Sequence, residues 1–196
     1  MANQQIIKPE DRELAASLRK QGYCMIDRTL KVTVSLGKRV DFSAFCRIPV
    51  EEHCGDMERI CEIAEESFLL DSRFMTSSQA TVEEICENIR ARVGQMKNFY
   101  VCRCRGDIAG FLELATDEKN PAEAEISLAA VDPKYRVAGV ALSLYGGVAK
   151  ICQEQGLKRL GGRISARNVS VMNLYVTLGA SFSLPQDVYV RSCEHA

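Results

Sequence analysis

Residues 125–151 read EISLAAVDPKYRVAGVALSLYGGVAKI, and this stretch decides the fold. Its first seven residues, 125–131, are mostly apolar and predict a strand. A charged turn follows, and from Gly139 onward apolar residues recur at helical spacing until Gly156 ends the pattern. A strand that leads through a short turn into a long amphipathic helix is typical of mixed α/β domains, which bind ligands where the strand ends.

Two adjacent glycines, Gly146 and Gly147, lie inside this predicted helix. A glycine in a helix interior costs about 1 kcal/mol relative to alanine. A sequence that keeps both glycines therefore predicts that another part of the chain packs closely against the helix at this point.

The rest of the chain alternates between strand and helix patterns, with no internal repeat or low-complexity segment. Thr81 and Glu84 form a capping box at the start of one helix, and Arg105-Gly106-Asp107 predicts the turn of a hairpin. The other predicted helices span 10–22, 56–68, 82–93 and 170–178, and the other predicted strands span 23–26, 30–36, 99–103, 108–115, 159–165 and 187–191.

Composition restricts the class of protein. The 196 residues carry 25 basic and 26 acidic side chains, and the resulting net charge of −1 argues against a dedicated binder of nucleic acid or anionic membranes. No apolar run reaches the roughly 18 residues of a membrane span, and the N-terminal MANQQIIKPEDRE does not resemble a secretory signal. We therefore expect a soluble, cytoplasmic globular protein.

Nine cysteines and two histidines offer little for metal or thiol chemistry. An odd number of cysteines at scattered positions fits reduced, buried thiols better than a disulfide framework. Cys102 and Cys104 lie on one face of a predicted strand, which is a poor match to zinc-ligand spacing. His53 and His195 are the only histidines, so we expect no metal site.

The turn before the long helix carries the pattern Arg136-x-x-Gly139-x-Ala141. The first amides of a helix have no acceptor within it, and the helix dipole adds about half a positive charge there, which suits a pyrophosphate. Gly139 removes a side chain where the backbone must come close to such a ligand. The pattern is neither a Walker loop nor a dinucleotide fingerprint, and a plain strand-to-helix turn is the alternative.

Several features follow one another in the C-terminal half: VDPKYR at 131–136, the Arg-x-x-Gly-x-Ala turn, a long helix, a strand, Asn168 and LYVTLGA at 174–180. Together they resemble the GNAT superfamily of acetyl-CoA-dependent N-acetyltransferases. The resemblance covers about residues 56–191 and is densest over 125–182.

This resemblance implies an α/β fold of the α+β kind, with a central mixed, mostly antiparallel sheet flanked by helices. We divide the chain into a small N-terminal α/β unit over residues 1–50 and a GNAT-like acetyltransferase domain over 51–196. The expected enzyme uses acetyl-CoA as its co-substrate and needs no metal.

The resemblance also implies which residues bind coenzyme A. In that family the Arg/Gln-x-x-Gly-x-Gly/Ala stretch holds the pyrophosphate through backbone amides, the preceding strand pairs with the pantetheine arm, and an asparagine before the last helix contacts that arm. Asn168 is that asparagine here, and a helix N-cap is its alternative role. The other implied residues are Leu128, Ala129 and Val131 on the strand, and Arg136, Val137, Ala138, Gly139, Val140 and Ala141 on the turn and helix.

Two residues are implied in catalysis. Tyr175 corresponds to the tyrosine that protonates the departing thiolate, although its helical stripe with Leu174 and Leu178 also fits a core residue. A carboxylate can take the proton of the amine, directly or through water, and Glu125 is the first candidate because it starts the central strand. Glu113 and Glu123 are the other candidates, and a surface ion pair is the alternative role of each.

The acceptor is less defined. SRF at 72–74 and LRKQGY at 18–23 resemble the bacterial dTDP-fucosamine acetyltransferases, which act on the amine of a nucleotide-linked aminosugar. Arg73 would then bind a substrate phosphate or carboxylate, and an ordinary surface arginine is the alternative.

We expect a small-molecule amine as partner, with no nucleic acid and no membrane, and a homodimer is left open. A protein N-terminal or lysine acetyltransferase and a non-catalytic acyl-CoA-binding module remain alternative functions.

Overall fold

The strands pair into one mixed sheet. The computed structural model describes residues 4–37, 40–53, 55, 57–75, 77–116, 120–136 and 139–191. The strands are β1 (Gln4–Ile7), β2 (Tyr23–Ser35), β3 (Val50–His53), β4 (Phe99–Cys104), β5 (Asp107–Thr116), β6 (Glu123–Val131), β7 (Arg159–Ser165) and β8 (Ser181–Arg191). The α-helices are α1 (Arg12–Lys20), α2 (Met57–Phe68), α3 (Val82–Val93), α4 (Val140–Glu154) and α5 (Val169–Thr177), and the 3-10 helices are η1 (Phe42–Phe45), η2 (Ser72–Phe74) and η3 (Pro133–Tyr135).

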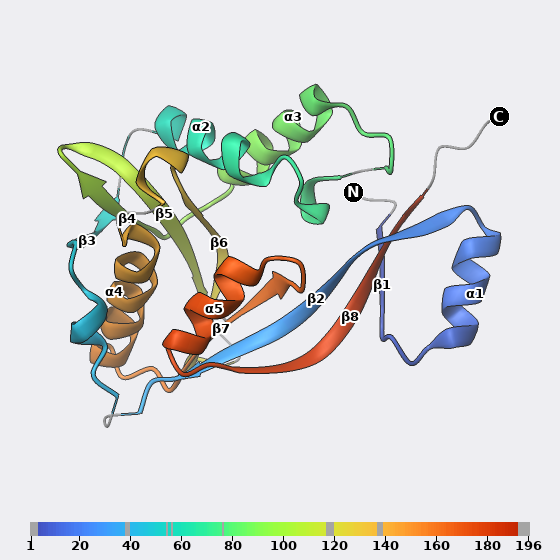
Figure 1. The fold of residues 1–196 in the computed structure, drawn as a ribbon. Helices are drawn as coiled ribbons and strands as arrows, with labels where there is room; N and C mark the ends of the chain where they lie inside the picture. Colours follow the sequence, from blue (N-terminus) through green and yellow to red (C-terminus); the bar gives the residue numbers. More distant parts are fainter. Residues whose placement is uncertain are drawn as a thin grey trace.

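The order of the strands is β1-β8-β2-β7-β6-β5-β4-β3 (Figure 1). Every neighbouring pair is antiparallel except β6 and β7, which run parallel because α4 connects them. The predicted fold class, a mixed and mostly antiparallel sheet flanked by helices, is confirmed.

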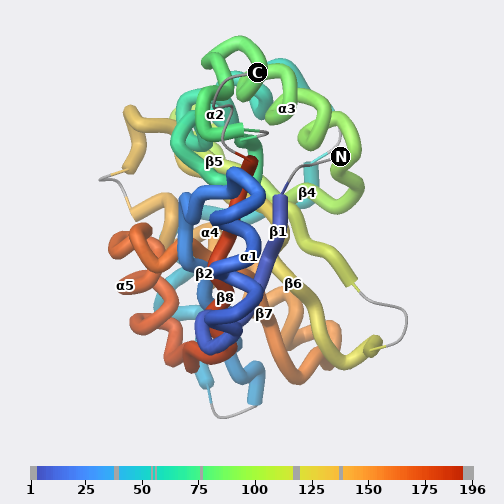
Figure 2. The backbone as a smooth tube through the Cα atoms, turned by 90° about the vertical axis from the view of Figure 1, so that its right-hand side faces the viewer, coloured from blue at the N-terminus to red at the C-terminus, as the bar shows by residue number. Residues whose placement is uncertain are grey.

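Helices cover both faces of the sheet. Helices α4 and α5 cover one face, and helices α2 and α3 cover the other (Figure 1). Side chains of α4 and α5 share a buried cluster with Val32 and Leu160, whereas those of α2 and α3 share one with Phe111. The short α1 lies beside β1 and β8 (Figure 2). Its Leu18 belongs to a small separate core with Ile7 and Tyr189. None of the helices in the described ranges is long and apolar enough to cross a membrane.

Strand β2 joins the N-terminal part of the chain to the rest of the sheet. It lies between β8 and β7, so strands from both sides of residue 50 share one sheet. The sequence predicted two strands here, but the structure has one strand of 13 residues that continues through the polar Asp27 and Thr29. Both side chains are buried, which explains why the apolar alternation is interrupted there. The division into 1–50 and 51–196 stays a prediction.

The glycine pair in α4 packs against the segment that precedes α2. A Cβ atom on Gly146 would lie 2.5 Å from the Cβ of Phe45, and one on Gly147 would lie 2.4 Å from a methyl group of Val50. The structure therefore confirms the predicted close packing, with η1 and the start of β3 as the neighbours of α4.

We expect Gly147→Ala to destabilise the protein by about 1–3 kcal/mol, because the added methyl group overpacks the contact with Val50. In an open helix the same change would stabilise by up to about 1 kcal/mol. Urea unfolding measures the difference, and Val50→Ala in the same chain should recover part of it. Gly94→Ala at the end of α3, where a Cβ meets only ordinary contacts, is the control. A Gly147→Ala variant as stable as the parent would contradict the close packing.

Candidate active site

A bulge in β6 determines where the site forms. Glu113 of β5 is paired with Leu128 and the next residue, Leu114, with Ile126, so Ser127 is an extra residue on β6. A bulge of this kind shifts which side chains face each way. Accordingly Ile126 packs under α4 and α5, whereas Leu128 packs under α2 and α3.

Beyond this bulge, β6 and β7 separate. Their parallel pairing runs from Glu123 with Arg159 to Ile126 with Gly162, and β7 then continues against β2 alone. Within the described residues, the edge of β6 that faces β7 therefore has no strand partner over 127–131. Such an edge can pair with an extended ligand. The sequence-predicted Leu128, Ala129 and Val131 all lie on this free edge of β6.

The hydroxyl of Tyr175 lies at the vertex where the two strands part. A Cβ atom on Gly162 would lie 2.9 Å from the Tyr175 hydroxyl oxygen and 3.3 Å from the carbonyl oxygen of Ile126. The ring is 1% exposed and makes an edge-to-face contact with Tyr145 of α4, with the ring centroids 5.3 Å apart. Tyr175 is therefore a core residue whose polar end reaches the vertex.

Burial shapes the acidity of this tyrosine pair. Loss of water contact raises the pKa of Tyr175 well above its usual range, and Tyr145 raises it further, whereas Arg73 lowers it. Burial likewise raises the pKa of Tyr145 to about 12. Among the described residues, none forms a hydrogen bond with the Tyr175 hydroxyl. The hydroxyl is thus protonated at neutral pH and able to donate to a ligand.

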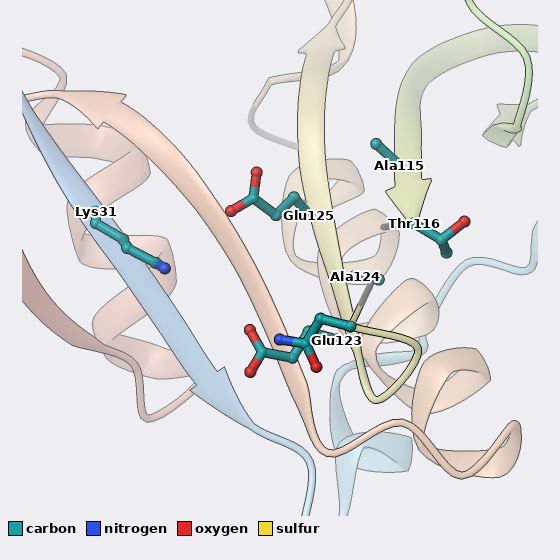
Figure 3. Close-up of a pocket in the computed structure, with 7 residues that line it drawn as sticks. Lys31, Ala115, Thr116, Glu123, Ala124 and Glu125 are labelled. Atoms are coloured by element: carbon teal, nitrogen blue, oxygen red, sulfur yellow. The ribbon is translucent and has the colours of Figure 1, made fainter. Parts of the chain in front are cut away.

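Glu125 reaches the same vertex from the opposite face of the sheet. It is paired with Gly161, and a Cβ atom on Gly161 would lie 3.6 Å from the Cγ of Glu125. Because consecutive residues of a strand face opposite ways, Glu125 lies on the face of Gly161, and Gly162 makes room for Tyr175 on the other face. Glu125 is exposed and, within the described chain, forms neither an ion pair nor a hydrogen bond (Figure 3).

The two other candidate carboxylates are already engaged. Glu123 forms an ion pair with Arg159. Glu113 is buried and accepts hydrogen bonds from Arg92 of α3 and from the Ser127 hydroxyl. Among the three, Glu125 is the carboxylate best placed to take a proton from a ligand.

The turn between β6 and α4 presents an open helix N-terminus. Gly139 is the N-cap with φ 75°, no side chain caps the helix, and a Cβ atom there would meet nothing within 4 Å. The buried Asp132 shapes the turn, since its carboxylate accepts from the Lys134 amide and pairs with Arg59 of α2. Of the sequence-predicted residues, Val140 is buried, Ala141 is half-buried and Arg136 is exposed, and Val137 and Ala138 lie outside the described residues.

Asn168 and Arg73 both take part in local structure. The Asn168 carboxamide oxygen accepts from the Val171 amide at 3.1 Å, which confirms the N-cap role and leaves its NH2 group to contact a ligand. Contact with pantetheine stays a prediction. Arg73 of η2 pairs with Asp71 and donates to the Ser127 carbonyl oxygen at 2.9 Å, so it reaches the start of the free edge of β6. Arg73 also borders a cavity of about 450 Å³ between η2, α3 and β6.

The described cysteines offer little to this chemistry. The seven described cysteines are free thiols, and burial raises the pKa of Cys102 to about 12 and that of Cys152 to about 11. Such thiols are poor nucleophiles. Cys54, Cys193 and His195 lie outside the described residues. Within the described part of the chain, no group of three or more potential ligand side chains could hold a metal ion.

Ser127, Gly161 and Gly162 also shape the site but were not predicted from the sequence. A pair of glycines inside a predicted strand indicates that another group comes close to the backbone, so this signal was present. The bulge at Ser127 had no local signal, because it depends on the pairing between β5 and β6.

Known proteins support the assignment of the fold. A model of the acetyltransferase (GNAT) family matches residues 57–180. The structure is similar to a GCN5-related N-acetyltransferase from Sphaerobacter thermophilus (TM-score 0.64, 15% identity, 95% of this chain and 58% of that chain). It is also similar to a GNAT acetyltransferase from Colwellia psychrerythraea (TM-score 0.61, 12% identity, 94% of this chain and 63% of that chain). A third similar structure is a GCN5-related N-acetyltransferase from Anabaena variabilis (TM-score 0.55, 10% identity, 95% of this chain and 45% of that chain).

At these identities the likeness to solved structures concerns the fold alone. The chain spans less than two thirds of the length of each of these three structures. No curated protein matches it in sequence.

We expect Gly162→Ala to destabilise the protein by about 1–3 kcal/mol, because the new methyl group collides with the Tyr175 hydroxyl. Gly161→Ala adds the same methyl group with only ordinary contacts and should be nearly neutral. Combining Gly162→Ala with Tyr175→Phe should recover part of the loss, as a double-mutant cycle in urea would show. Equal stability of the two single variants would place the hydroxyl elsewhere.

Proposed function

This chain belongs to the acetyltransferase (GNAT) family, and we propose that it transfers an acetyl group from acetyl-CoA to the amine of a small molecule. One observation carries the proposal. At the vertex between β6 and β7, the Tyr175 hydroxyl and the Glu125 side chain approach from opposite faces of the sheet. A proton acceptor and a proton donor on either side of one opening are what amine acylation by a thioester needs.

The donor would bind along the opening between the strands. The uncapped N-terminus of α4 suits the pyrophosphate of coenzyme A, with Gly139 leaving room for it and Arg136 adding positive charge. The free edge of β6 suits the pantetheine arm, and its amides can donate to the thioester oxygen. When bound, acetyl-CoA supplies the activated acetyl group.

The vertex residues would then move two protons. Glu125 takes a proton from the acceptor amine, directly or through water, as the nitrogen–carbon bond forms. Tyr175 donates its proton to the sulfur as the carbon–sulfur bond breaks. Because burial raises the pKa of Tyr175, the hydroxyl keeps its proton until that step.

The vertex favours an enzyme over a non-catalytic module. An acyl-CoA-binding module needs the α4 turn and the free edge of β6, but it needs neither a buried hydroxyl at the vertex nor, opposite it, a glutamate that pairs with no described residue. Whether the acceptor is a small molecule or a protein, and the finer resemblance to dTDP-fucosamine acetyltransferases, stay predictions. So do the cytoplasmic location, the absence of nucleic-acid and membrane partners, and the homodimer.

Acetyl-CoA should raise the thermal midpoint, because a ligand bound only by the folded state stabilises it by mass action. At a hundredfold excess over the dissociation constant the gain is about 2.7 kcal/mol, or roughly 5–10 °C for a chain of this size. Gly139→Asp should abolish the shift, since it puts bulk and negative charge at the pyrophosphate position.

Gly156→Asp is the matched control for this experiment. Gly156 also has positive φ and open space around it, but it lies beyond the other end of α4. A parent protein whose midpoint does not respond to saturating acetyl-CoA would refute the proposed donor.

Tyr175→Phe should lower kcat by about a hundred- to ten-thousandfold while acetyl-CoA still binds, because only the proton donor is lost. Tyr145→Phe is the control, since it removes a hydroxyl from the neighbouring buried ring. For both variants, the release of coenzyme A with an accepted amine gives kcat, and thermal unfolding gives the midpoint. Full turnover by Tyr175→Phe with a lowered midpoint would make the residue purely structural.

A further inference from the structure

Two cations face each other on the sheet beside the vertex. Lys31 of β2 is directly opposite Arg163 of β7 in an antiparallel pair. Side chains at such positions start about 4.5–5.5 Å apart, and like charges there are destabilising. Both residues are half-buried, and neither forms an ion pair within the described part of the chain.

The Arg163 guanidinium is held in place by neutral groups. One of its nitrogens donates to the Thr29 hydroxyl and to the Leu184 carbonyl oxygen, each at 3.2 Å. Burial lowers the pKa of Arg163, and the nearby Glu125 carboxylate only partly offsets this effect. Among the described residues no carboxylate bonds to this guanidinium, so it keeps donors to spare in a fixed position.

The residue that helps to hold Arg163 is itself strained. Leu184 has φ 48°, is exposed, and lies where the pairing of β8 with β2 shifts register. A leucine in this backbone region costs about 1–3 kcal/mol, and such residues are concentrated at functional sites. Here the strained segment turns a carbonyl group toward Arg163.

The cation pair lies next to the candidate base. Lys31 lines a cavity of about 310 Å³ together with Glu123 and Glu125 (Figure 3). Arg159 already neutralises Glu123. Arg163 is two residues beyond Gly161 along β7, so the Cα atoms of these two residues are roughly 7 Å apart. Gly161 is the partner of Glu125 on β6.

We propose that Lys31 and Arg163 bind an anionic group, a carboxylate or a phosphate, that is part of the amine acceptor. The inference rests on the proposed function, in which the amine lies at Glu125. Arginine binds such anions through two parallel hydrogen bonds and lysine adds a point charge. The bound anion also relieves the repulsion between the two cations. The acceptor is then a small amino acid or an amino phosphate, with its amine and anion at the two ends.

The first test measures anion binding by the full chain without any turnover. Inorganic phosphate, or acetate in a parallel titration, should raise the thermal midpoint saturably in low-salt buffer. Lys31→Gln and Arg163→Gln should each weaken that binding about ten- to hundredfold, the loss expected for a hydrogen bond to a charged group. Lys158→Gln removes the same formal charge from an exposed position and should bind like the parent.

The second measurement is the stability of the variants in buffer without any added anion. Lys31→Gln should be at least as stable as the parent in anion-free buffer, because it removes the repulsion with Arg163. The Lys31→Gln variant therefore tests the anion site even if Arg163→Gln folds poorly because it loses the bond to Leu184. An unsaturable response of the parent, or unchanged binding by Lys31→Gln, would overturn the anion site.

The kinetic test compares amines that differ only in an anionic group. With acetyl-CoA, 4-aminobutyrate is compared with butylamine, and phosphoethanolamine with ethanolamine, so the two pairs separate carboxylate from phosphate. The anionic member of at least one pair should have the higher kcat/KM, and Lys31→Gln should remove this preference mainly through KM. Equal use of charged and neutral amines would refute the anion site and leave the acetyltransferase intact. Absence of both turnover and an acetyl-CoA shift would refute the proposed function, and the phosphate titration would still decide the anion site.

Discussion

The site depends on the point where β6 leaves β7. Their parallel pairing ends after Ile126, beside the extra residue Ser127. A bulge leaves backbone groups without a partner in the sheet, and here the Ser127 carbonyl oxygen accepts from Arg73. The Ser127 hydroxyl and Arg92 both bond to the buried Glu113 carboxylate. The strand that is set free then runs directly into the turn before α4. One continuous stretch of chain therefore supplies both a strand edge that pairs with no described strand and an open helix N-terminus.

Close approach at glycines brings the other elements to this opening. Gly162 lets the Tyr175 hydroxyl reach the vertex, which Glu125 reaches from the opposite face of the sheet beside Gly161. Gly146 and Gly147 let α4 lie against the N-terminal segment, which fixes the helix that carries Tyr145. At Gly146, Gly147 and Gly162 the missing Cβ atom allows a contact that a larger residue would not permit without a shift.

Strand β2 brings the N-terminal part of the chain up to the candidate site. The carboxylate of Asp27, which is 5% exposed, accepts hydrogen bonds from the Ser72 hydroxyl at 3.1 Å and the Ser165 hydroxyl at 2.8 Å. These bonds tie η2, and with it Arg73, to β2 and β7. The same strand places Lys31 directly opposite Arg163 of β7. The polar residues that interrupt the apolar pattern of β2 are thus the residues that connect it to the site.

By itself the sequence determined the strand at 125–131, the turn and helix after it, the capping box at Thr81, and a close neighbour for the glycines of α4. These features follow from periodicity and turn chemistry, which act between residues near one another in the chain. Only the tertiary structure decided the place of β2 between β7 and β8, the bulge at Ser127, and the meeting of Lys31 with Arg163. Those depend on which distant strands pair and in which register, and a local pattern does not encode the partner of a strand.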